Sequence, residues 1–369
     1  MNSSHELVER QPSSLRLKTY HSVWRPIINV QVGLPHPSDD NQQMFRILID
    51  TGSAEFWVPS VDCDSDEQPK NTFDPSKSST FVDLHQDSFN IQYLDGSYAV
   101  CYAARDSVVL ENLHVFSFPL SLATKVRGNS PVIDGVMGIP REDDSHSVVR
   151  YLFAHYAKLI SFYYFCDFDF GDDESTVESS SVQLDESHIQ SGEITIGERD
   201  PRLGFLSTTV WVDTLPSKHH WNVRVAQFKI GDEIIEIEES AQKYTIDTGS
   251  NYSFLPQNIL EALFRYLGVT PPANEGDIVD YVPCNSINNK PPISIVFADG
   301  QHVVIPAKYL VLFVSKHQCI PVFDWTFAER PGRVVIGGGL LRAFYTSFDY
   351  ETKRVGFAEK ICGRSMNPT

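Results

Sequence analysis

The sequence contains one short motif twice, about half a chain length apart. The first copy, at positions 47–60, reads ILIDTGSAEFWVPS, and the second, at 244–256, reads YTIDTGSNYSFLP. In both copies apolar residues lead into Asp-Thr-Gly-Ser, and an aromatic residue follows shortly before a proline. A single copy would indicate only a strand that ends in a turn, with the aspartate bound to its own backbone. Two copies predict two related halves of one chain.

A second pair of segments repeats in step with the first. Asp-Gly-Val-Met-Gly ends at Gly138 and Val-Val-Ile-Gly ends at Gly337, at nearly the same interval after Asp50 and Asp247 respectively. Two elements that recur in the same order and at the same spacing are much harder to obtain by chance than one. The repeat is therefore expected to extend through both halves.

Each motif predicts an apolar strand that carries its aspartate to the strand end, where Gly52 or Gly249 allows a tight turn. If the halves face each other across a pseudo-twofold axis, Asp50 and Asp247 come into contact. Two carboxylates at that range cannot both ionise easily, so the pair shares one proton and offers an acid and a base together. This chemistry needs no metal and no cofactor, and we expect neither.

These motifs resemble those of the pepsin-like aspartic proteases, a bilobal family of the eukaryotic type, over about residues 24–362. The family pattern of two apolar residues, Asp-Thr-Gly-Ser and then Trp-Val-Pro-Ser is complete in the first half. The resemblance implies a mainly β fold with two pseudo-twofold-related β-lobes and few short helices. It places a tail or prosegment remnant at 1–23, an N-terminal lobe with a flap at 24–200 and a C-terminal lobe at 201–369.

The resemblance also implies an activity, the hydrolysis of peptide bonds within proteins. A water held between Asp50 and Asp247 would lose a proton to the ionised carboxylate, while the protonated one polarises the scissile carbonyl. Expected features are an acidic working pH, hydrophobic residues on both sides of the cut, polypeptide substrates, inhibition by pepstatin-like compounds and a monomeric state. The alternative is a silent relative that only binds proteins. Such relatives typically lack an aspartate or the flap tyrosine, and neither is missing here.

The resemblance assigns supporting roles to four further residues. Ser53 and Ser250 lie three residues after the aspartates, close enough to hydrogen-bond the outer carboxylate oxygen and favour its ionisation, or simply to cap the turns. Tyr93 matches the flap tyrosine that closes over substrate, and Trp57 matches the indole that hydrogen-bonds its phenol. The alternative for both aromatic residues is an ordinary place in the core.

Substrate contacts are expected at the flap tip and beside the first motif. Residues 89–110 alternate on both sides of Asp95-Gly96, which predicts a hairpin. Asp95, Gly96, Ser97 and Leu48 are assigned to substrate binding, and Asp95 would allow Lys or Arg beside the scissile bond unless it only starts the turn.

Two positions depart from the family pattern. Leu94 replaces a small residue after the flap tyrosine, which would stiffen the flap or narrow the cleft entrance. Gly338 replaces an aspartate, which would loosen the loop behind Asp247 and lower stability more than activity.

The six cysteines show no spacing typical of a metal site. The resemblance pairs Cys284 with Cys319 in the C-terminal lobe and Cys166 with Cys362 between the lobes, and the pair that remains is Cys63 with Cys101. Disulfides predict an oxidising compartment, hence a secreted or endolysosomal protein. Reduced thiols in a cytosolic protein are the alternative. The N-terminal residues MNSSHELVERQPSSLRLK contain no apolar stretch of the kind found in a signal peptide.

Charge and hydropathy exclude some partners. The chain carries 48 acidic and 30 basic residues, a net charge of −18, which argues against nucleic acid or an anionic membrane as a partner. No apolar run is long enough to span a bilayer.

Local patterns predict several elements. We expect a strand over 24–33, helices over 148–159 and 257–267 with Gly268 ending the second, and a closing hairpin over 344–358. The acidic, serine-rich stretch 167–186 is expected to be an exposed loop.

Overall fold

The computed structural model describes residues 13–20, 25–37, 41–67, 69–128, 130–143, 147–164, 166, 190–270, 281–315, 317–324 and 334–362. Within these residues the chain forms 25 strands and three α-helices, together with short 3-10 turns. The expected mainly β fold is confirmed.

The strands are short, and most are joined by tight turns. Those of the first half are β1 (Ser14–Tyr20), β2 (Ile27–Val32), β3 (Met44–Asp50), β4 (Phe56–Ser65), β5 (Val82–Asp83), β6 (Phe89–Gln92), β7 (Tyr98–Leu110), β8 (Leu113–Arg127), β9 (Gly135–Gly138), β10 (Leu159–Tyr164) and β11 (Gln190–Gly197). Those of the second half are β12 (Val210–Asp213), β13 (Asn222–Ile230), β14 (Glu233–Glu236), β15 (Lys243–Asp247), β16 (Ser253–Phe254), β17 (Val282–Pro283), β18 (Ile293–Phe297), β19 (His302–Ile305), β20 (Val311–Ser315), β21 (Gln318–Pro321), β22 (Phe323–Asp324), β23 (Val335–Gly337), β24 (Phe344–Asp349) and β25 (Arg354–Glu359). The helices are α1 (Val148–Leu152), α2 (Gln257–Leu267) and α3 (Gly338–Leu341).

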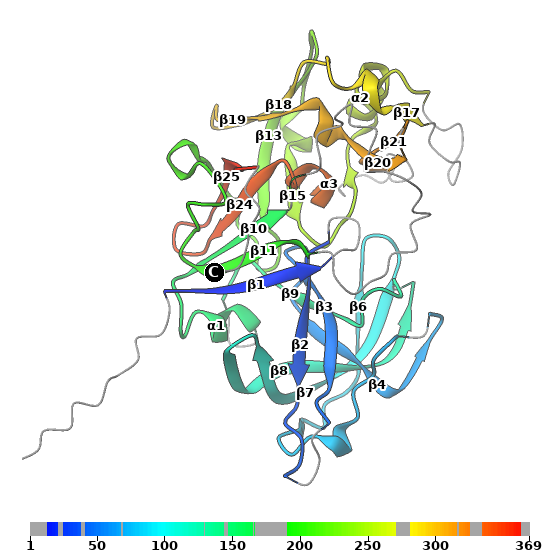
Figure 1. Cartoon of the computed structure of the whole chain (residues 1–369), viewed down its shortest axis with the longest axis vertical. Helices are drawn as coiled ribbons and strands as arrows, with labels where there is room; N and C mark the ends of the chain where they lie inside the picture. Colours follow the sequence, from blue (N-terminus) through cyan, green and yellow to red (C-terminus); the bar gives the residue numbers. More distant parts are fainter. Residues whose placement is uncertain are drawn as a thin grey trace, which may run out of the picture.

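One large sheet runs through both halves of the chain. Its 14 strands follow the order β12-β25-β24-β10-β11-β1-β2-β3-β9-β4-β8-β7-β5, with β6 paired to β7. In Figure 1 the strands β24, β10, β11 and β1 lie between the blue-to-cyan lobe of the first half and the yellow-to-orange lobe of the second. Because β10 pairs with β24, backbone hydrogen bonds cross the boundary that the sequence places near residue 200.

The strand pairing repeats in the two halves, as the duplicated motifs predict. In the first half β3 runs parallel to β9, and Asp50 pairs with Gly138. In the second half β15 runs parallel to β23, and Asp247 pairs with Gly337. Both aspartate-bearing strands are largely buried, which explains their continuous apolar character.

The two halves also share one hydrophobic core. Phe348 of β24 contacts Phe162 of β10 and Trp221 of the second half edge-on, with ring centroids 5.5 and 5.1 Å apart. Edge-on aromatic pairs are favourable beyond the area that they bury. This shared core holds the lobes in a fixed relation.

Several local predictions are confirmed. Helix α2 covers Gln257–Leu267, and Gly268 ends it with a positive φ of 78°. Strands β24 and β25 form the closing hairpin. Within the stretch 1–23, which was expected to be a tail or prosegment remnant, Ser14–Tyr20 form the strand β1, and this strand pairs with β11. Residues 1–12 and the acidic stretch 167–186 lie outside the described residues.

The helix expected over 148–159 is much shorter than predicted. Helix α1 ends at Leu152, and the Phe153 N–H closes its last turn. The apolar residues that follow are used differently, because the Phe153 ring packs 4.7 Å from Tyr350 and Leu159 begins β10 opposite Asp349. Tertiary packing therefore overrides the helical spacing of this stretch.

Two of the three expected disulfides are present, Cys166–Cys362 and Cys284–Cys319. The third is not formed, since Cys63 and Cys101 are free thiols. Cys63 lies on β4 and Cys101 on β7, and β8 pairs with both of these strands. The thiols are therefore on strands that flank β8 instead of on directly paired strands.

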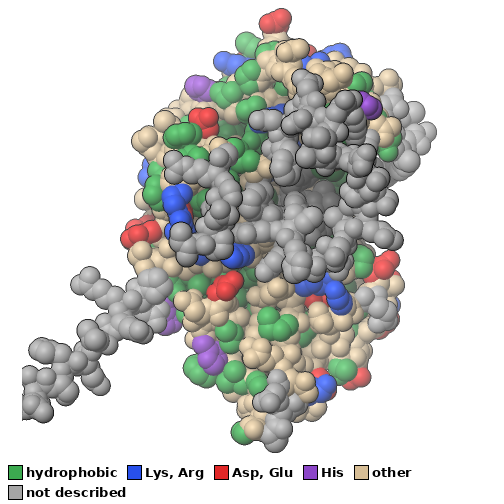
Figure 2. All heavy atoms as spheres, in the orientation of Figure 1, with side chains coloured by type: hydrophobic (Ala, Val, Ile, Leu, Met, Phe, Trp, Pro, Cys, Tyr) green, Lys and Arg blue, Asp and Glu red, His purple; other side chains and the backbone are tan. Residues whose placement is uncertain are grey.

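Acidic side chains on the face shown in Figure 2 lie scattered among basic and neutral ones. Among the described residues, no helix has the length and apolar character needed to cross a membrane.

Candidate active site

Two aspartates meet where the halves of the chain join. Asp50 is the last residue of β3 and Asp247 the last residue of β15. The two residues are only 5% and 8% exposed, and they lie close enough for the charge of Asp50 to raise the pKa of Asp247. They border a cavity of about 700 Å³ that both halves line. The contact between carboxylates that the repeated motif predicts is therefore present.

The residue after each aspartate joins the two motifs. The N–H of Thr51 donates to the Thr248 hydroxyl at 3.1 Å, and the N–H of Thr248 donates to the Thr51 hydroxyl at 3.0 Å. Each hydroxyl also donates to a carbonyl of the opposite half, that of Ile246 or Ile49, at 2.9 and 2.8 Å. Sequence reasoning assigned these threonines no role, although their presence in both motifs was an available signal.

Gly52 and Gly249 leave space for the opposite carboxylate. A Cβ on Gly52 would lie 2.5 Å from Asp247 Oδ2, and a Cβ on Gly249 would lie 2.3 Å from Asp50 Oδ1. Neither glycine has a positive φ. The chain turns at Gly52 and bends at Gly249, and the glycines have a second role there, because each aspartate packs directly against the backbone of the other motif.

Asp50 accepts hydrogen bonds from donors within its own loop. The Gly52 N–H contacts its Oδ1 at 2.7 Å, and the Ser53 hydroxyl contacts its Oδ2 at 2.5 Å. Both donors stabilise a negative charge on this carboxylate.

Asp247 has a different set of donors. Its Oδ1 accepts from the backbone N–H groups of Gly249 at 2.8 Å and Ser250 at 3.3 Å. The Ser250 hydroxyl donates instead to the Tyr252 carbonyl at 2.9 Å, so the hydroxyl contact expected for this serine is not formed. Burial, followed by the neighbouring charge of Asp50, raises the pKa of Asp247 well above its usual value, and the two backbone donors oppose that rise.

Tyr93 and Trp57 form the contact that the resemblance implies. The Trp57 indole N–H donates to the Tyr93 hydroxyl at 2.7 Å, and Trp57 is 1% exposed. Tyr93 follows β6 at the start of the flap turn, where its N–H donates to the Ser97 carbonyl at 2.9 Å. Burial raises the pKa of Tyr93 well above its usual value, so its phenol keeps its proton.

The flap tip is a compact turn. Asp95 accepts from the Ser97 N–H at 2.9 Å and the Ser97 hydroxyl at 2.6 Å, and Gly96 has a φ of 91°. Asp95 therefore starts the turn, but it also lines the cavity together with Leu94, Ser97 and Leu48. Gly96 shapes the turn without lining the cavity.

The two glycines of the second repeat lie against the aspartate loops. A Cβ on Gly138 would meet the backbone of the first loop, and a Cβ on Gly337 would lie 2.2 Å from the Tyr252 carbonyl oxygen. At the position that departs from the family pattern, the Gly338 N–H donates to the Ser250 carbonyl at 2.7 Å. This backbone hydrogen bond ties the start of α3 to the loop that follows Asp247.

Four basic residues that sequence reasoning missed also line the cavity: Arg25, His219, His220 and Lys243. Burial lowers the pKa of Arg25, while the charge of Asp95 raises it. In the described part of the chain, no group of three or more His, Cys, Asp or Glu side chains is placed to hold a metal ion.

The duplicated halves and the two aspartates that meet between them agree with the resemblance to pepsin-like aspartic proteases. The family model for eukaryotic aspartyl proteases matches residues 27–360, and the chain belongs to that family.

Curated relatives are distant but match along most of their length. Pepsin B of Canis lupus familiaris is 25% identical over 331 residues, which cover 86% of this chain and 78% of the relative. Mucorpepsin of Rhizomucor pusillus is 27% identical over 359 residues, which cover 92% of this chain and 80% of the relative. Cathepsin E of Cavia porcellus is 27% identical over 361 residues, which cover 93% of this chain and 85% of the relative.

Proposed function

We propose that this protein is an endopeptidase that hydrolyses peptide bonds with a water activated between Asp50 and Asp247. The observation that carries the proposal is the meeting of two buried aspartates at one cavity, each packed against the glycine of the other motif. Such a pair holds one proton between two oxygen acids, which provides a base and an acid at the same place.

The environments of the two carboxylates suggest their roles. Asp247 is the general acid, because burial and the neighbouring charge favour its protonated form. Asp50 is the general base, because a hydroxyl and an N–H donate to its carboxylate. The water loses a proton to Asp50 and attacks the carbonyl carbon while Asp247 protonates the carbonyl oxygen. Collapse of the tetrahedral intermediate returns that proton to Asp247, and Asp50 gives its proton to the leaving amide nitrogen.

Single protonation of the dyad sets the working pH. Activity requires a pH between the two apparent pKa values of the pair, and we place the optimum on the acidic side. The cavity supports hydrophobic residues on both sides of the cut, since Leu48 and Ile133 line it from the first half and Val334 and Val335 from the second.

The flap and its tip complete the proposed substrate site. Tyr93 closes over the bound peptide, and Ser97 and Leu48 contact it. Asp95 accepts a basic side chain beside the scissile bond, supported by its position on the cavity wall.

The family and the cysteines support proposals on the oligomeric state, inhibition, activation and cellular setting of the protein. We propose a monomeric protein that pepstatin-like compounds inhibit, made as a zymogen and acting in a secreted or endolysosomal setting. The two disulfides support an oxidising compartment.

The test is digestion of an unfolded protein at about pH 4 by the wild type and by the variants Asp50→Asn and Asp247→Asn. We expect cleavage that a pepstatin-like inhibitor abolishes, and no cleavage by either variant while both stay folded by circular dichroism. Cleavage retained in a variant would refute the dyad assignment. A folded wild type that cleaves no substrate would instead favour the silent, protein-binding relative.

A further inference from the structure

The wall that the second half contributes to the cavity is basic beside the dyad. His219, His220 and Lys243 all line the cavity. The first half lines the cavity with apolar side chains and with the charged residues Arg25, Asp50, Glu55 and Asp95. The second half adds Asp324 and the apolar residues Phe254, Val334 and Val335, so its basic character is confined to the two histidines and Lys243.

Strand alternation explains why these side chains face the cavity. Lys243, Thr245 and Asp247 are alternate residues of β15 and point to one face of the sheet. Asn222 of β13 pairs with Thr245, and the Thr245 hydroxyl donates to the Asn222 side-chain oxygen at 2.8 Å. His220 lies two residues before Asn222. Lys243 and His220 are thus placed on the face that carries the catalytic Asp247.

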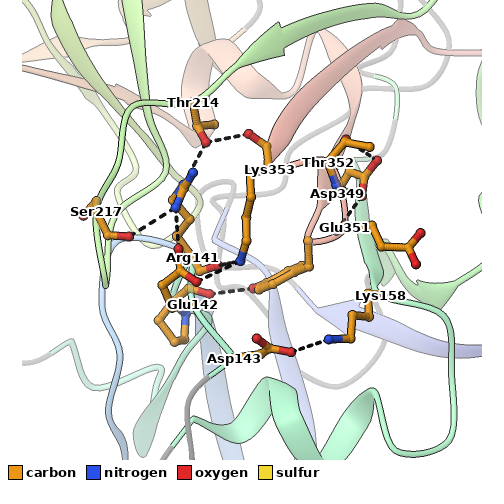
Figure 3. Close-up of polar contacts among 12 residues, drawn as sticks. Arg141, Glu142, Asp143, Lys158, Thr214, Ser217, Asp349, Glu351, Thr352 and Lys353 are labelled. Carbon is orange, nitrogen blue, oxygen red and sulfur yellow. Dashed lines mark hydrogen bonds and ion pairs between the residues drawn. The ribbon is translucent and has the colours of Figure 1, made fainter.

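The histidines stand on a segment that the first half holds in place. The Arg141 N–H donates to the His219 carbonyl at 3.1 Å, and the Arg141 Nε donates to the Thr214 hydroxyl at 2.8 Å. Figure 3 shows the Arg141 guanidinium pointing at Thr214 and Ser217, while the Lys353 Nζ contacts the Arg141 carbonyl from the other side at 2.9 Å. The backbone of the two histidines is therefore fixed relative to the dyad.

The nearby charges repel one another. His220 is exposed at the cavity mouth, and partial loss of solvent lowers its pKa. His219 and Lys243 lower that pKa further, while the Gly52 backbone and the charge of Asp50 raise it. Across the strand pair from Lys243 lies Arg224, whose guanidinium is 3.6 Å from Glu239. An anion bound in the cavity beside these groups would relieve this repulsion.

We propose that His219, His220 and Lys243, here called the basic wall, form a subsite for an acidic side chain of the substrate. The preferred peptide has a hydrophobic residue at the cut and Asp or Glu at one nearby position on one side of it. This inference rests on the proposed endopeptidase function and adds a specificity that sequence patterns do not indicate. The carboxylate would accept hydrogen bonds and positive charge from the basic wall while the flap closes over the peptide.

The test compares peptides that differ only in Glu or Gln at one position, scanned over the residues on both sides of the scissile bond. At about pH 5 most Glu side chains are ionised, and we expect Glu to raise kcat/KM by about fivefold at one position, the upper range for a partly exposed ion pair. Lys243→Met and His220→Gln should each reduce this ratio towards one. Lys218→Met is the matched control, because Lys218 is exposed on the same segment but does not line the cavity, and its ratio should stay unchanged.

The dependence on pH gives a second readout. The Glu-to-Gln ratio should rise as Glu ionises near pH about 4.3, and fall again as His220, whose pKa is lowered, loses its proton. The fall should be absent in His220→Gln. A merely structural role of His220 would change the activity on both peptides equally.

Failure of the inference and failure of the proposed function give different results. Cleavage of Gln peptides with a Glu-to-Gln ratio of one at every position would overturn the subsite alone. If no peptide is cleaved, the proposed function fails, and the subsite is then tested by titrating both peptides into the protein and following the histidine ring signals by NMR. Equal shifts with Glu and Gln peptides would overturn it.

Discussion

Thr248→Val should destabilise the protein through the hydrogen bonds that join the two motifs. Thr248 is fully buried, its hydroxyl accepts from the Thr51 N–H, and it donates to the Ile49 carbonyl. Valine has nearly the same shape but no hydroxyl, so both backbone groups lose this partner. A buried donor without a partner costs about 1–3 kcal/mol and a carbonyl about 1 kcal/mol, so we expect the free energy of unfolding to fall by about 2–4 kcal/mol.

Thr248→Ser is the matched control. Serine keeps both hydrogen bonds and removes one buried methyl group, which should cost about 1 kcal/mol. Both variants would be made in the inactive Asp50→Asn background, so that self-digestion does not contribute. Urea unfolding followed by tryptophan fluorescence is a suitable assay, because Trp57 and Trp221 are buried in opposite halves.

The pair of variants separates the hydrogen bonds from packing. If Thr248→Val and Thr248→Ser lose the same stability, the reciprocal contacts contribute nothing beyond packing and the reasoning is refuted. In the active background, Thr248→Val should also lower kcat/KM by about 10–100-fold, because a small displacement of one aspartate loop misaligns the dyad.

Three further predictions concern the dyad and the flap. The pKa of Asp247 is raised on folding, so its protonated form stabilises the folded protein. This stabilisation is fully present below the unfolded pKa and is lost as the pH rises through the folded pKa. The variant Asp247→Asn should therefore gain stability over the wild type by about 1.4 kcal/mol per pH unit across that window, and a pH-independent difference in urea unfolding would contradict this. Gly249→Ala should lower kcat by about 100-fold or more with a folded circular dichroism spectrum, because its Cβ would lie 2.3 Å from Asp50 Oδ1; wild-type turnover would refute the packing account. Tyr93→Phe leaves the Trp57 N–H without its phenol partner, so thermal and urea unfolding should show a loss of about 1 kcal/mol, and an unchanged midpoint would contradict it.

The duplicated motif was sufficient to predict the central architecture. The repeat predicted two halves built alike, and the structure shows the same parallel pairing in both, Asp50 with Gly138 and Asp247 with Gly337. The bounds of helix α2 were also predicted from the sequence, because its amphipathic spacing stops at Gly268, which adopts a left-handed conformation. These features depend on short-range patterns, which a sequence carries directly.

Other features were decided by contacts between distant segments. The helical spacing after Leu152 was overridden, because the residues that follow pack on the closing hairpin and start β10. The expected Cys63–Cys101 bond is also not formed, although both thiols belong to one hydrophobic cluster.

The sequence by itself determined that two aspartates would meet, because each copy of the motif carries the same strand, turn and side chain. Only the tertiary structure decided what surrounds them. Gly52 and Gly249 are required by a carboxylate nearly two hundred positions away, and His220 and Lys243 become neighbours of Asp247 through the pairing of β13 with β15. A motif specifies what is local along the chain, whereas the charge and shape of a cavity arise from residues that the fold brings together.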